Sequence, residues 1–469
     1  MEPTKTRSKP LAAHVAEFVA ATRYQNVPPE TVRVAKKHIL DTLAVGLAGV
    51  PAEGSDIVRR YVEKLGCSDG AATIFGTAQR AIPRFAALAN ATAMHADDYD
   101  DTYHPTRFHP SAPVLAAAVA EGEQTGASGK DVLAAFAVGT EVSVKLSHTI
   151  DKQHYLRGFH MTSTCGVFGA TAGVCNVRRL STEATLRAIG IAGSESAGVR
   201  ENFGTMVKPF HSGRAAENAV VAASLAEMGF TSAPTILEGN RGYFMTGAGG
   251  YDAAELIGKL GNPWNYVTER VAIKPYPCGN LQQPAMDKLR ELVLAHDVKP
   301  DQVERLAIRS HRLMPLNLTY HRPRTGLEGK FSMEFSLASI LVLRRAGLAE
   351  YTDEVVNRPD VQDAIGKMDY TVFSDEEAEA KGYHLWTTFL DLKLNDGRTL
   401  SARADAAKGS ASMPLTEEEV AEKFRDCAAF ARMPKDRAEK VIVLVLELEK
   451  LDDIRTLTAL LRAMTGARV

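Results

Sequence analysis

Acidic and imidazole side chains are concentrated in one short stretch of this chain, residues 95–111. Four aspartates occupy five neighbouring positions, and three histidines lie around them: Asp97, Asp98, Asp100, Asp101, His95, His104 and His109. Like charges this close repel one another, and burying any of them without a partner costs several kcal/mol. Packing alone would not favour such a cluster. The stretch therefore predicts a site that handles a cation, a proton or a metal ion.

Three interpretations of the aspartates are open at this point. As a solvated helix end, the run would place Asp97 and Asp101 on one face, with Asp98 and Thr102 on a neighbouring one. As a magnesium site, the run from Asp97 to Asp101 matches the D-D-x-x-D pattern of all-helical terpenoid synthases. No second Asn/Ser/Glu metal motif follows on a later helix, and a β-rich third quarter has no place in that fold. As an acid–base site, one aspartate would be the base and a histidine the acid.

Two further segments favour the acid–base interpretation. His160 precedes a segment of small residues, so its ring is expected near the centre of a helical bundle. Residues 208–214 place Lys208, His211 and Arg214 in a predicted loop before a helix. Cationic groups beside a helix N-terminus suit an anion. These segments together predict a site for a negatively charged ligand.

The elements that position these residues are mostly helices. Apolar residues recur at helical spacing from Pro29 to Gly49, and again after Ser128, which is a typical N-cap. Residues 164–177 are almost free of large side chains. Because such a helix can be approached closely by its neighbours, we place it at the centre of a bundle.

The pattern changes near Pro275, after which strand-like runs predominate. The predicted strands are 303–310, 370–373, 386–394 and 398–404, with a hairpin at Asn395-Asp396-Gly397 and one helix at 333–345. Helical periodicity returns after Gly409, where Thr416-x-x-Glu419 forms a capping box. The predicted fold is mainly α. Residues 1–274 and 410–469 form a helical domain, and residues 275–409 form an inserted α+β domain behind the proline-stiffened turn that begins at Lys274.

Composition narrows the class of protein. A length of 469 residues predicts two domains, and a formal net charge of -2 argues against nucleic acid or an acidic membrane surface as partner. The five cysteines are scattered without a C-x-x-C pair, which favours reduced thiols. Residues 1–10 lack the apolar core of a signal peptide, and no run approaches a membrane span. We expect a cytoplasmic protein that binds neither nucleic acid nor membrane.

Several motifs in order along nearly the whole chain resemble the MmgE/PrpD family. They are Leu40-Asp41-Thr42-Leu43, the His95–Pro113 stretch, Gly158-Phe159-His160, residues 205–216 around Lys208-Pro209-Phe210-His211, Lys274-Pro275-Tyr276-Pro277 and Thr325–Ser332. The family contains 2-methylcitrate dehydratase, iminodisuccinate epimerase and cis-aconitate decarboxylase. The resemblance implies a homodimer and a helical domain with a smaller α+β lid, with the active site between them. It also implies no metal and no organic cofactor.

The resemblance also implies which residues act. Matching the family's motifs residue by residue gives five catalytic positions: Asp98, Thr102, His109, His160 and Lys208. We expect five further residues to bind substrate: His104, His211, Arg214, Lys274 and Gln283. Gln283 departs from the family, which usually has a histidine there. Glutamine cannot exchange a proton near neutral pH, and we expect it to orient a carboxylate by hydrogen bonding.

The chemistry shared by these enzymes is making or breaking a bond beside a carboxylate, through an enediolate-like carbanion. Cationic donors such as Lys208 can stabilise the developing charge. We expect a lyase acting on a small di- or tricarboxylic acid, most simply a 2-methylcitrate dehydratase-like enzyme. The alternatives are an iminodisuccinate epimerase-like isomerase, a cis-aconitate decarboxylase-like enzyme, and a catalytically silent paralogue that only binds a polycarboxylate. We also expect the aspartates to be partly paired with basic side chains and backbone donors.

Overall fold

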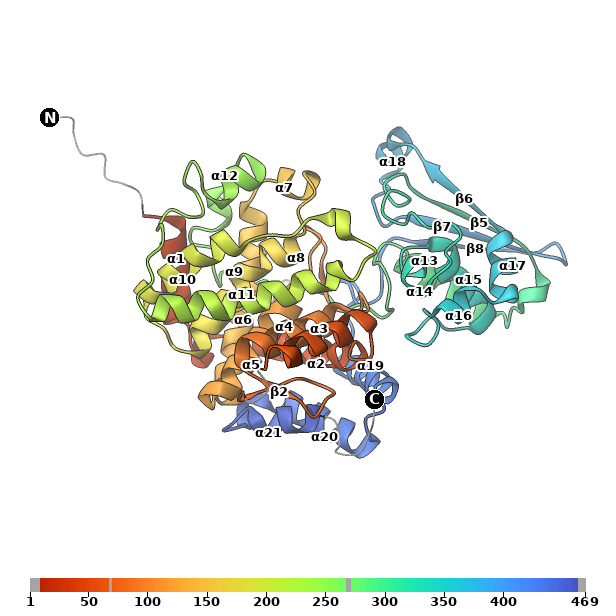
Figure 1. Cartoon of the computed structure of the whole chain (residues 1–469). Coiled ribbons are helices and arrows are strands. Elements are labelled where there is room, and N and C mark those ends of the chain that lie inside the picture. The colour runs from red at the N-terminus through yellow and green to blue at the C-terminus, as the bar shows by residue number, and fades with distance from the viewer. Residues whose placement is uncertain (1–8, 67–69, 267–270, 463–469) are drawn as a thin grey trace. The chain divides into compact units, whose positions relative to one another are not determined.

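The computed structural model of the chain (Figure 1) describes residues 9–66, 70–266 and 271–462. These residues form two compact units. The first, called the helical unit, comprises the chain up to Ala96, Asp100–Val271 and the chain from Glu417 onward. The second, called the mixed unit, comprises Asp97–Tyr99 and Ala272–Thr416. Most described elements are helices, so the predicted mainly α fold is confirmed.

The helical unit consists of helices with a few two-residue strands. Its helices are α1 Leu11–Ala21, α2 Pro29–Ala48, α3 Glu53–Lys64, α4 Pro83–His95, α5 Ser111–Thr125, α6 Gly129–Thr149, α7 Gln153–Leu156, α8 Met161–Thr164, α9 Gly166–Val177, α10 Thr182–Glu195, α11 Val207–Glu227, α12 Tyr243–Ala248, α19 Glu417–Phe430, α20 Lys435–Leu446 and α21 Arg455–Thr458. Its strands are β1 Ala72–Thr73, β2 Arg80–Ala81 and β3 Thr102–Tyr103, and β4 Val271–Ala272 ends it. Ser128 caps α6 by accepting from the Asp131 amide, as predicted.

Helix α9 is the centre of the helical unit, as its small residues predicted. Every residue of α9 is buried, and it packs against α5, α6, α10 and α11 (Figure 1). A Cβ atom on Gly139 of α6 would lie 2.6 Å from the carbonyl oxygen of Gly169 of α9. A Cβ on Gly169 would lie 2.6 Å from the carbonyl oxygen of Gly139. Both glycines are therefore required by the close approach of the two backbones.

The last helices complete the helical unit. Helices α19 and α20 both pack against α2. Lys423 of α19 forms an ion pair with Asp41 of α2 at 2.5 Å, and both side chains are buried. Burial raises the pKa of Asp41 to about 6 even with the lysine beside it. The contact fixes the chain's end to a helix near its beginning.

The mixed unit is built on one four-stranded sheet with the order β6-β5-β7-β8. Its strands are β5 Val303–His311, β6 Met368–Phe373, β7 Thr388–Leu394 and β8 Thr399–Ala404, and its helices are α13 Gln283–Ala295, α14 Gly326–Gly329, α15 Met333–Leu343, α16 Asp353–Val356, α17 Pro359–Gly366 and α18 Asp375–Lys381. Strand β6 runs parallel to β5, whereas β7 is antiparallel to both β5 and β8. The predicted β7–β8 hairpin is confirmed, with Gly397 at φ 89° in its turn.

One face of this sheet is covered by helices. Helix α13 packs on β7 and β8, and α15 packs on α13 and α17. The inward residues of β7 alternate with exposed ones, and they join the helices in one apolar core. The core holds the start of α13, where Gln283 lies, in a fixed position.

Two expectations concern membranes and thiols. Among the described residues, no helix combines the length and the apolar character needed to cross a membrane. The four described cysteines, Cys165, Cys175, Cys278 and Cys427, are buried free thiols. Cys67 and residues 1–8 lie outside the described residues.

Candidate active site

The aspartate stretch is a loop, so the structure does not support the interpretation of a solvated helix end. Helix α4 ends at His95, and residues 96–101 form turns and bends. Asp98 has φ 52°, the left-handed conformation that aspartate tolerates but a continuing helix does not. The loop lets neighbouring carboxylates point to different partners. A continuous helix would have stacked Asp97 over Asp101 and left two like charges side by side.

The first two aspartates are neutralised within the mixed unit. The Lys330 ammonium donates to the carbonyl and the Oδ1 of Asp97, at 2.8 Å each. The Lys274 ammonium donates to the carbonyl of Asp98 at 2.7 Å and to its Oδ1 at 3.0 Å. Both lysines are almost fully buried. Each is therefore a fixed partner for one carboxylate.

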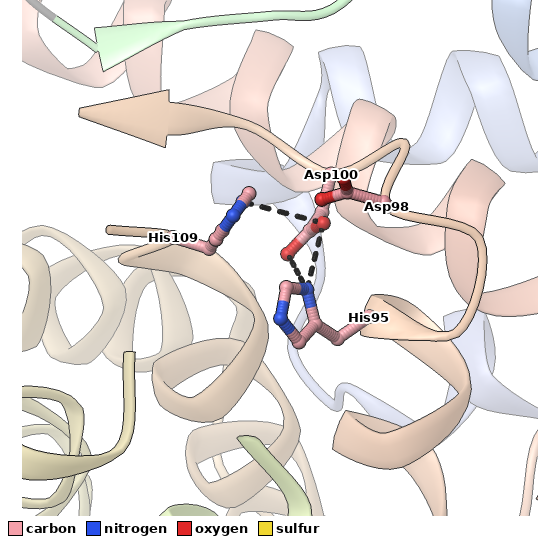
Figure 2. Close-up of side chains that lie close together, drawn as sticks. All are labelled: His95, Asp98, Asp100 and His109. Carbon is pink, nitrogen blue, oxygen red and sulfur yellow. Dashed lines mark hydrogen bonds and ion pairs between the residues drawn. The ribbon is translucent and has the colours of Figure 1, made fainter. Parts of the chain in front are cut away.

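The third aspartate, Asp100, lies between two imidazoles in the helical unit (Figure 2). His95 Nδ1 is 2.9 Å from both oxygens of Asp100, and His109 Nδ1 is 3.4 Å from Oδ1. The His95 and His109 rings are 4.5 Å apart between centroids. Asp100 and His95 are fully buried, so this pairing works in a low-dielectric setting.

The fourth aspartate, Asp101, holds His109 in place. Its carboxylate accepts from His38 Nδ1 at 2.7 Å and from the Ser111 hydroxyl at 2.5 Å. Its backbone carbonyl accepts from His109 Nδ1 at 2.7 Å. That last bond fixes the tautomer of His109, with the proton on Nδ1. The Ser111 amide also lies 3.4 Å from Asp101 Oδ1, so the predicted pairing of the aspartates with basic side chains and backbone donors is confirmed.

The basic segment at 208–214 is not a loop. Helix α11 begins at Val207, so Lys208, His211 and Arg214 lie on its first two turns. Pro209 lies in the first turn of this helix, where proline is tolerated. A Cβ on Gly213 would lie 2.6 Å from the Leu88 carbonyl oxygen, so the glycine permits close packing against α4. The helix places Lys208 and His211 on the same face, three residues apart.

His160 and His211 extend the group of imidazoles. His160 Nδ1 and His211 Nδ1 are 3.0 Å apart, so one ring must donate and the other accept. The His160 ring also lies 5.8 Å from His95 and nearly parallel to it. Lys208 is buried, with its ammonium 5.5 Å from the Phe203 ring centre. We call His95, His109, His160, His211 and Lys208 the imidazole cluster.

Electrostatics keep part of this cluster neutral. Burial lowers the pKa of His160 well below its usual value, and the nearby charges of His95, Lys208, His109 and His211 act in the same direction. Burial, His95 and Lys208 lower the pKa of His211 to about 4. Both imidazoles would gain affinity for a proton if an anion entered, because its charge would offset that of the lysine.

The other expected residues have different surroundings. Thr102 is buried in β3, with its hydroxyl 3.4 Å from His109 Nδ1, and His104 is half-buried. Arg214 forms an ion pair with Glu217, and 42% of its side chain is exposed. The contact directs its guanidinium toward that glutamate. The structure therefore gives Arg214 an evident partner other than a substrate.

Gln283 also has a role that its expected function does not explain. It is buried at the start of α13, and its amide nitrogen lies 3.3 Å from the carbonyls of Tyr276, Cys278 and Gly279. These bonds occupy the donor with which it would have oriented a carboxylate. Its position instead stabilises the turn that follows Lys274. Orientation of substrate by this amide is at odds with that geometry.

Sequence reasoning did not select His95, Asp100 or Lys330 as site residues, although all three lie in motifs it used. The feature of the sequence that could have identified His95 and Asp100 is their spacing of five residues at the end of a helix. For Lys330 no local signal exists, because its partner Asp97 lies 233 residues away. Such pairs emerge only from the fold.

The side chains of His95, Asp100 and His109 could also bind a metal ion. Atoms of His95, Asp100 and His109 lie within 4.8 Å of one another, close enough to share an ion. Both imidazoles, however, direct Nδ1 at oxygen acceptors, so these nitrogens carry protons that an ion would have to displace. The hydrogen bonds fit proton chemistry better than metal binding.

The arrangement combines a buried ammonium, several imidazoles and one shared carboxylate. A lysine with neutral imidazoles around it can bind carboxylates and stabilise charge that develops on their oxygens. An imidazole paired with a carboxylate can hold or move a proton. The cluster can therefore bind a polyanion and protonate or deprotonate a carbon beside one of its carboxylates.

Comparison with known proteins agrees with this reading. The model of the MmgE/PrpD N-terminal domain matches residues 13–255, and that of the MmgE/PrpD C-terminal domain matches residues 276–450. Human cis-aconitate decarboxylase is 28% identical over 472 residues, covering 98% of this chain and 96% of the relative. The mouse protein of that name is 28% identical over 467 residues, covering 97% and 94%. The protein of that name from Aspergillus terreus is 27% identical over 484 residues, covering 96% of each.

These relatives are decarboxylases, and decarboxylases are lyases, so the expectation of an enzyme of the lyase class is confirmed. The two matched domains span most of the residues and follow one another in the order that the motifs predicted. This chain therefore belongs to the MmgE/PrpD family.

Proposed function

We propose that this protein is a cofactor-independent lyase that removes one carboxylate, as CO2, from an unsaturated tricarboxylic acid of the cis-aconitate kind. The observation that carries the proposal is the imidazole cluster, in which a buried lysine and four imidazoles lie together and two of the imidazoles, His95 and His109, contact one carboxylate, Asp100. Such a site favours a polyanion. The names of the three relatives support this choice of substrate over methylcitrate or an amino-dicarboxylate.

The chemistry of such a substrate requires two things from the protein. Breaking the bond between a methylene carbon and its carboxylate releases CO2 and leaves the bonding electron pair on that carbon. The pair forms a new C=C bond, and the pair of the existing C=C bond moves to the carbon beside another carboxylate. The result is an enediolate-like carbanion. It must be stabilised by cations and then protonated at carbon.

The cluster can meet both requirements. Lys208 and the His160–His211 pair would hold the carboxylates that the substrate retains, and an imidazole would supply the proton. Asp98, Thr102, His104 and Lys274 remain candidates on the strength of the motifs. Gln283 would act indirectly, by fixing the backbone turn next to Lys274.

Proton NMR in deuterated water with a panel of acids tests the proposal. The panel contains citrate, methylcitrate, cis-aconitate and an amino-dicarboxylate. We expect CO2 release from cis-aconitate, with one deuterium added to the product at the carbon beside a retained carboxylate. Dehydration would release water and no CO2, and epimerisation would place deuterium in an acid of unchanged carbon skeleton. Either result without CO2 release overturns the decarboxylase assignment.

The His160→Ala variant tests whether the cluster performs the reaction. We expect its kcat/KM to fall by about a hundredfold or more, as for loss of a donor that stabilises charge on the substrate's carboxylates. An exposed basic residue, Lys130, gives the control Lys130→Met, which should retain full activity. Turnover by His160→Ala equal to that of the wild type would show that the cluster does not perform the reaction. No turnover of any acid by the wild type would favour a silent binding protein.

We also propose a homodimer in the cytoplasm, on the strength of the family resemblance for the first and of composition for the second. Light scattering coupled to size-exclusion chromatography would measure the mass of the particle. A monomeric mass across the micromolar range would contradict the dimer. Fractionation of the source cells would test the compartment.

A further inference from the structure

His95 has an environment that packing does not explain. Its side chain is fully buried at the end of α4, and its Nδ1 is 2.9 Å from both oxygens of Asp100. Its Nε2 is buried too, yet has no hydrogen-bond partner among the described residues. Figure 2 shows this nitrogen on the side of the ring turned away from Asp100. A buried polar atom left without a partner destabilises the folded protein, so a ligand atom that pairs with it would recover that cost.

The members of the imidazole cluster differ in how well they can carry an extra proton. His160 and His211 share a hydrogen bond through their Nδ1 atoms, which requires a neutral acceptor ring. His109 directs its Nδ1 at the backbone carbonyl of Asp101 at 2.7 Å, and the nearest oxygen of Asp100 lies farther from that nitrogen, at 3.4 Å. His95 instead directs its Nδ1 at both oxygens of a carboxylate. A buried carboxylate on one ring nitrogen stabilises the imidazolium and fixes the tautomer, leaving the other nitrogen to act.

The place of His95 in the cluster also suits contact with a substrate. Its ring centre lies 4.5 Å from that of His109 and 5.8 Å from that of His160, two residues that the family motifs assign to catalysis. Its charge contributes to the lowered pKa of His160 and of His211. An anion bound by those side chains would lie beside the unpartnered Nε2.

We infer that His95 and Asp100 form an acid–base dyad, with His95 as a further catalytic residue that exchanges a proton with the substrate carbon through Nε2. The inference rests on the proposed lyase function. In the decarboxylation, imidazolium Nε2–H gives its proton to the carbanion carbon once CO2 has left, and the electron pair of the carbanion forms the new C–H bond. The imidazole is then neutral and regains a proton from water. Asp100 remains a carboxylate throughout.

Variants of both residues test the dyad with cis-aconitate as the probe. We expect His95→Gln to lower kcat by at least a hundredfold while KM stays within about threefold, because the change removes proton transfer rather than binding. Asp100→Asn should lower kcat by about tenfold to a hundredfold with KM again little changed, since the amide cannot stabilise an imidazolium. If His95→Gln fails to fold, Asp100→Asn alone decides the case.

Chemical rescue separates proton transfer from the filling of space. Imidazole added to His95→Gly should raise kcat by at least tenfold in a saturable way, whereas pyrazole, which has the same shape and is only weakly basic, should not. The matched control is His154, a buried histidine with both nitrogens hydrogen-bonded, to the Gly247 carbonyl and the Thr164 hydroxyl. His154→Gln should keep kcat within about threefold of the wild type.

Three results would overturn the dyad. They are a kcat of His95→Gln or Asp100→Asn within threefold of the wild type, equal rescue of His95→Gly by imidazole and pyrazole, or a rise in KM that accounts for the whole loss. Failure of the proposed function is a different result, because then the wild-type protein itself releases no CO2 from any acid in the panel.

Discussion

The charge of Lys208 should be measurable through its neighbour on α11. Burial lowers the pKa of His211 to about 4, and the charges of His95 and Lys208 contribute to this shift. Replacing Lys208 with methionine keeps the length of the side chain and removes its charge. We therefore expect the pKa of His211 to rise in Lys208→Met.

The size of the rise follows from the helix. Residues three apart on a helix have Cβ atoms about 5–6 Å apart. At about 6 Å and an effective dielectric constant of about 20, a unit charge changes the free energy of protonation by about 3 kcal/mol, or about 2 pKa units. Burial and the charge of His95 lower the pKa of His211 more than Lys208 does, so about 2 units is an upper value for the effect of Lys208. We expect a rise of about one unit, to a pKa of about 5.

NMR titration of protein labelled at histidine measures this pKa, with the His211 signal assigned by its loss in His211→Gln. Lys130→Met is the matched control, because Lys130 is exposed and lies outside the cluster. A change smaller than about a third of a unit in Lys208→Met, or an equal change in the control, would refute the electrostatic reasoning.

The same pKa makes stability depend on pH. In the unfolded chain His211 titrates near 6.5, whereas in the folded protein its pKa is about 4. The unfolded state thus binds more protons in this window, and the free energy of unfolding contributed by His211 falls as the pH is lowered from 6.5 toward 4. The free energy of unfolding of Lys208→Met should fall less than that of the wild type between pH 6.5 and pH 4. Urea unfolding at pH 7 and pH 5 gives the comparison.

Four further outcomes are expected. Gly139→Ala should lower the free energy of unfolding by about 2 kcal/mol or more, since its Cβ would lie 2.6 Å from a carbonyl oxygen of α9. The control Gly250→Ala should change it by less than about 0.5 kcal/mol, because the Cβ there has one neighbour, at 3.9 Å. Lys423→Met should lower the free energy of unfolding by about 3–5 kcal/mol at pH 7.5. The loss should be smaller at pH 5, because the pKa of Asp41 is raised to about 6 and its carboxyl is then mostly protonated. Equal losses at the two pH values would argue against the ion pair. Gln283→Ala should cost about 1–3 kcal/mol in urea unfolding by leaving turn carbonyls without their donor, and an unchanged midpoint would mean that these bonds contribute nothing. Exhaustive chelation should leave the rate of CO2 release unchanged, and a loss that magnesium restores would reopen the metal interpretation.

Local rules were sufficient to predict most of the elements. The apolar spacing of α2, the cap at Ser128 and the small residues of α9 each depend on residues within one or two turns. The β7–β8 hairpin likewise depends on its own turn residues. In each case the determinant and the element lie in the same short window of sequence.

Two local features of the site depend on contact with distant residues. The aspartates leave the helical pattern because Lys274 and Lys330 pair with Asp98 and Asp97 from more than 170 residues away. Residues 208–214 are helical although Gly213 suggests a loop, because the glycine fits against α4. A short window of sequence around the aspartates does not contain their lysines, and one around Gly213 does not contain α4.

The candidate site was predictable as a set of residue types but not as a hydrogen-bond network. The motifs led to His109, His160 and Lys208, all of which lie in the imidazole cluster. They did not separate the roles of four similar imidazoles. That separation depends on which ring nitrogen meets a carboxylate, a carbonyl or another imidazole, and those partners are set by the fold.

The return of the chain through α19 and α20 has a consequence for synthesis. Helix α2 is buried along most of its length, partly by these two helices, and Asp41 on it meets Lys423 only after some 380 further residues have been made. A nascent chain that has not yet reached α19 therefore exposes an apolar helix face and a carboxylate without its lysine. Domains generally fold as units during translation, and here the first unit to begin is the last to be complete. The N-terminal half made alone should aggregate, because the face of α2 that α19 and α20 cover would then be exposed.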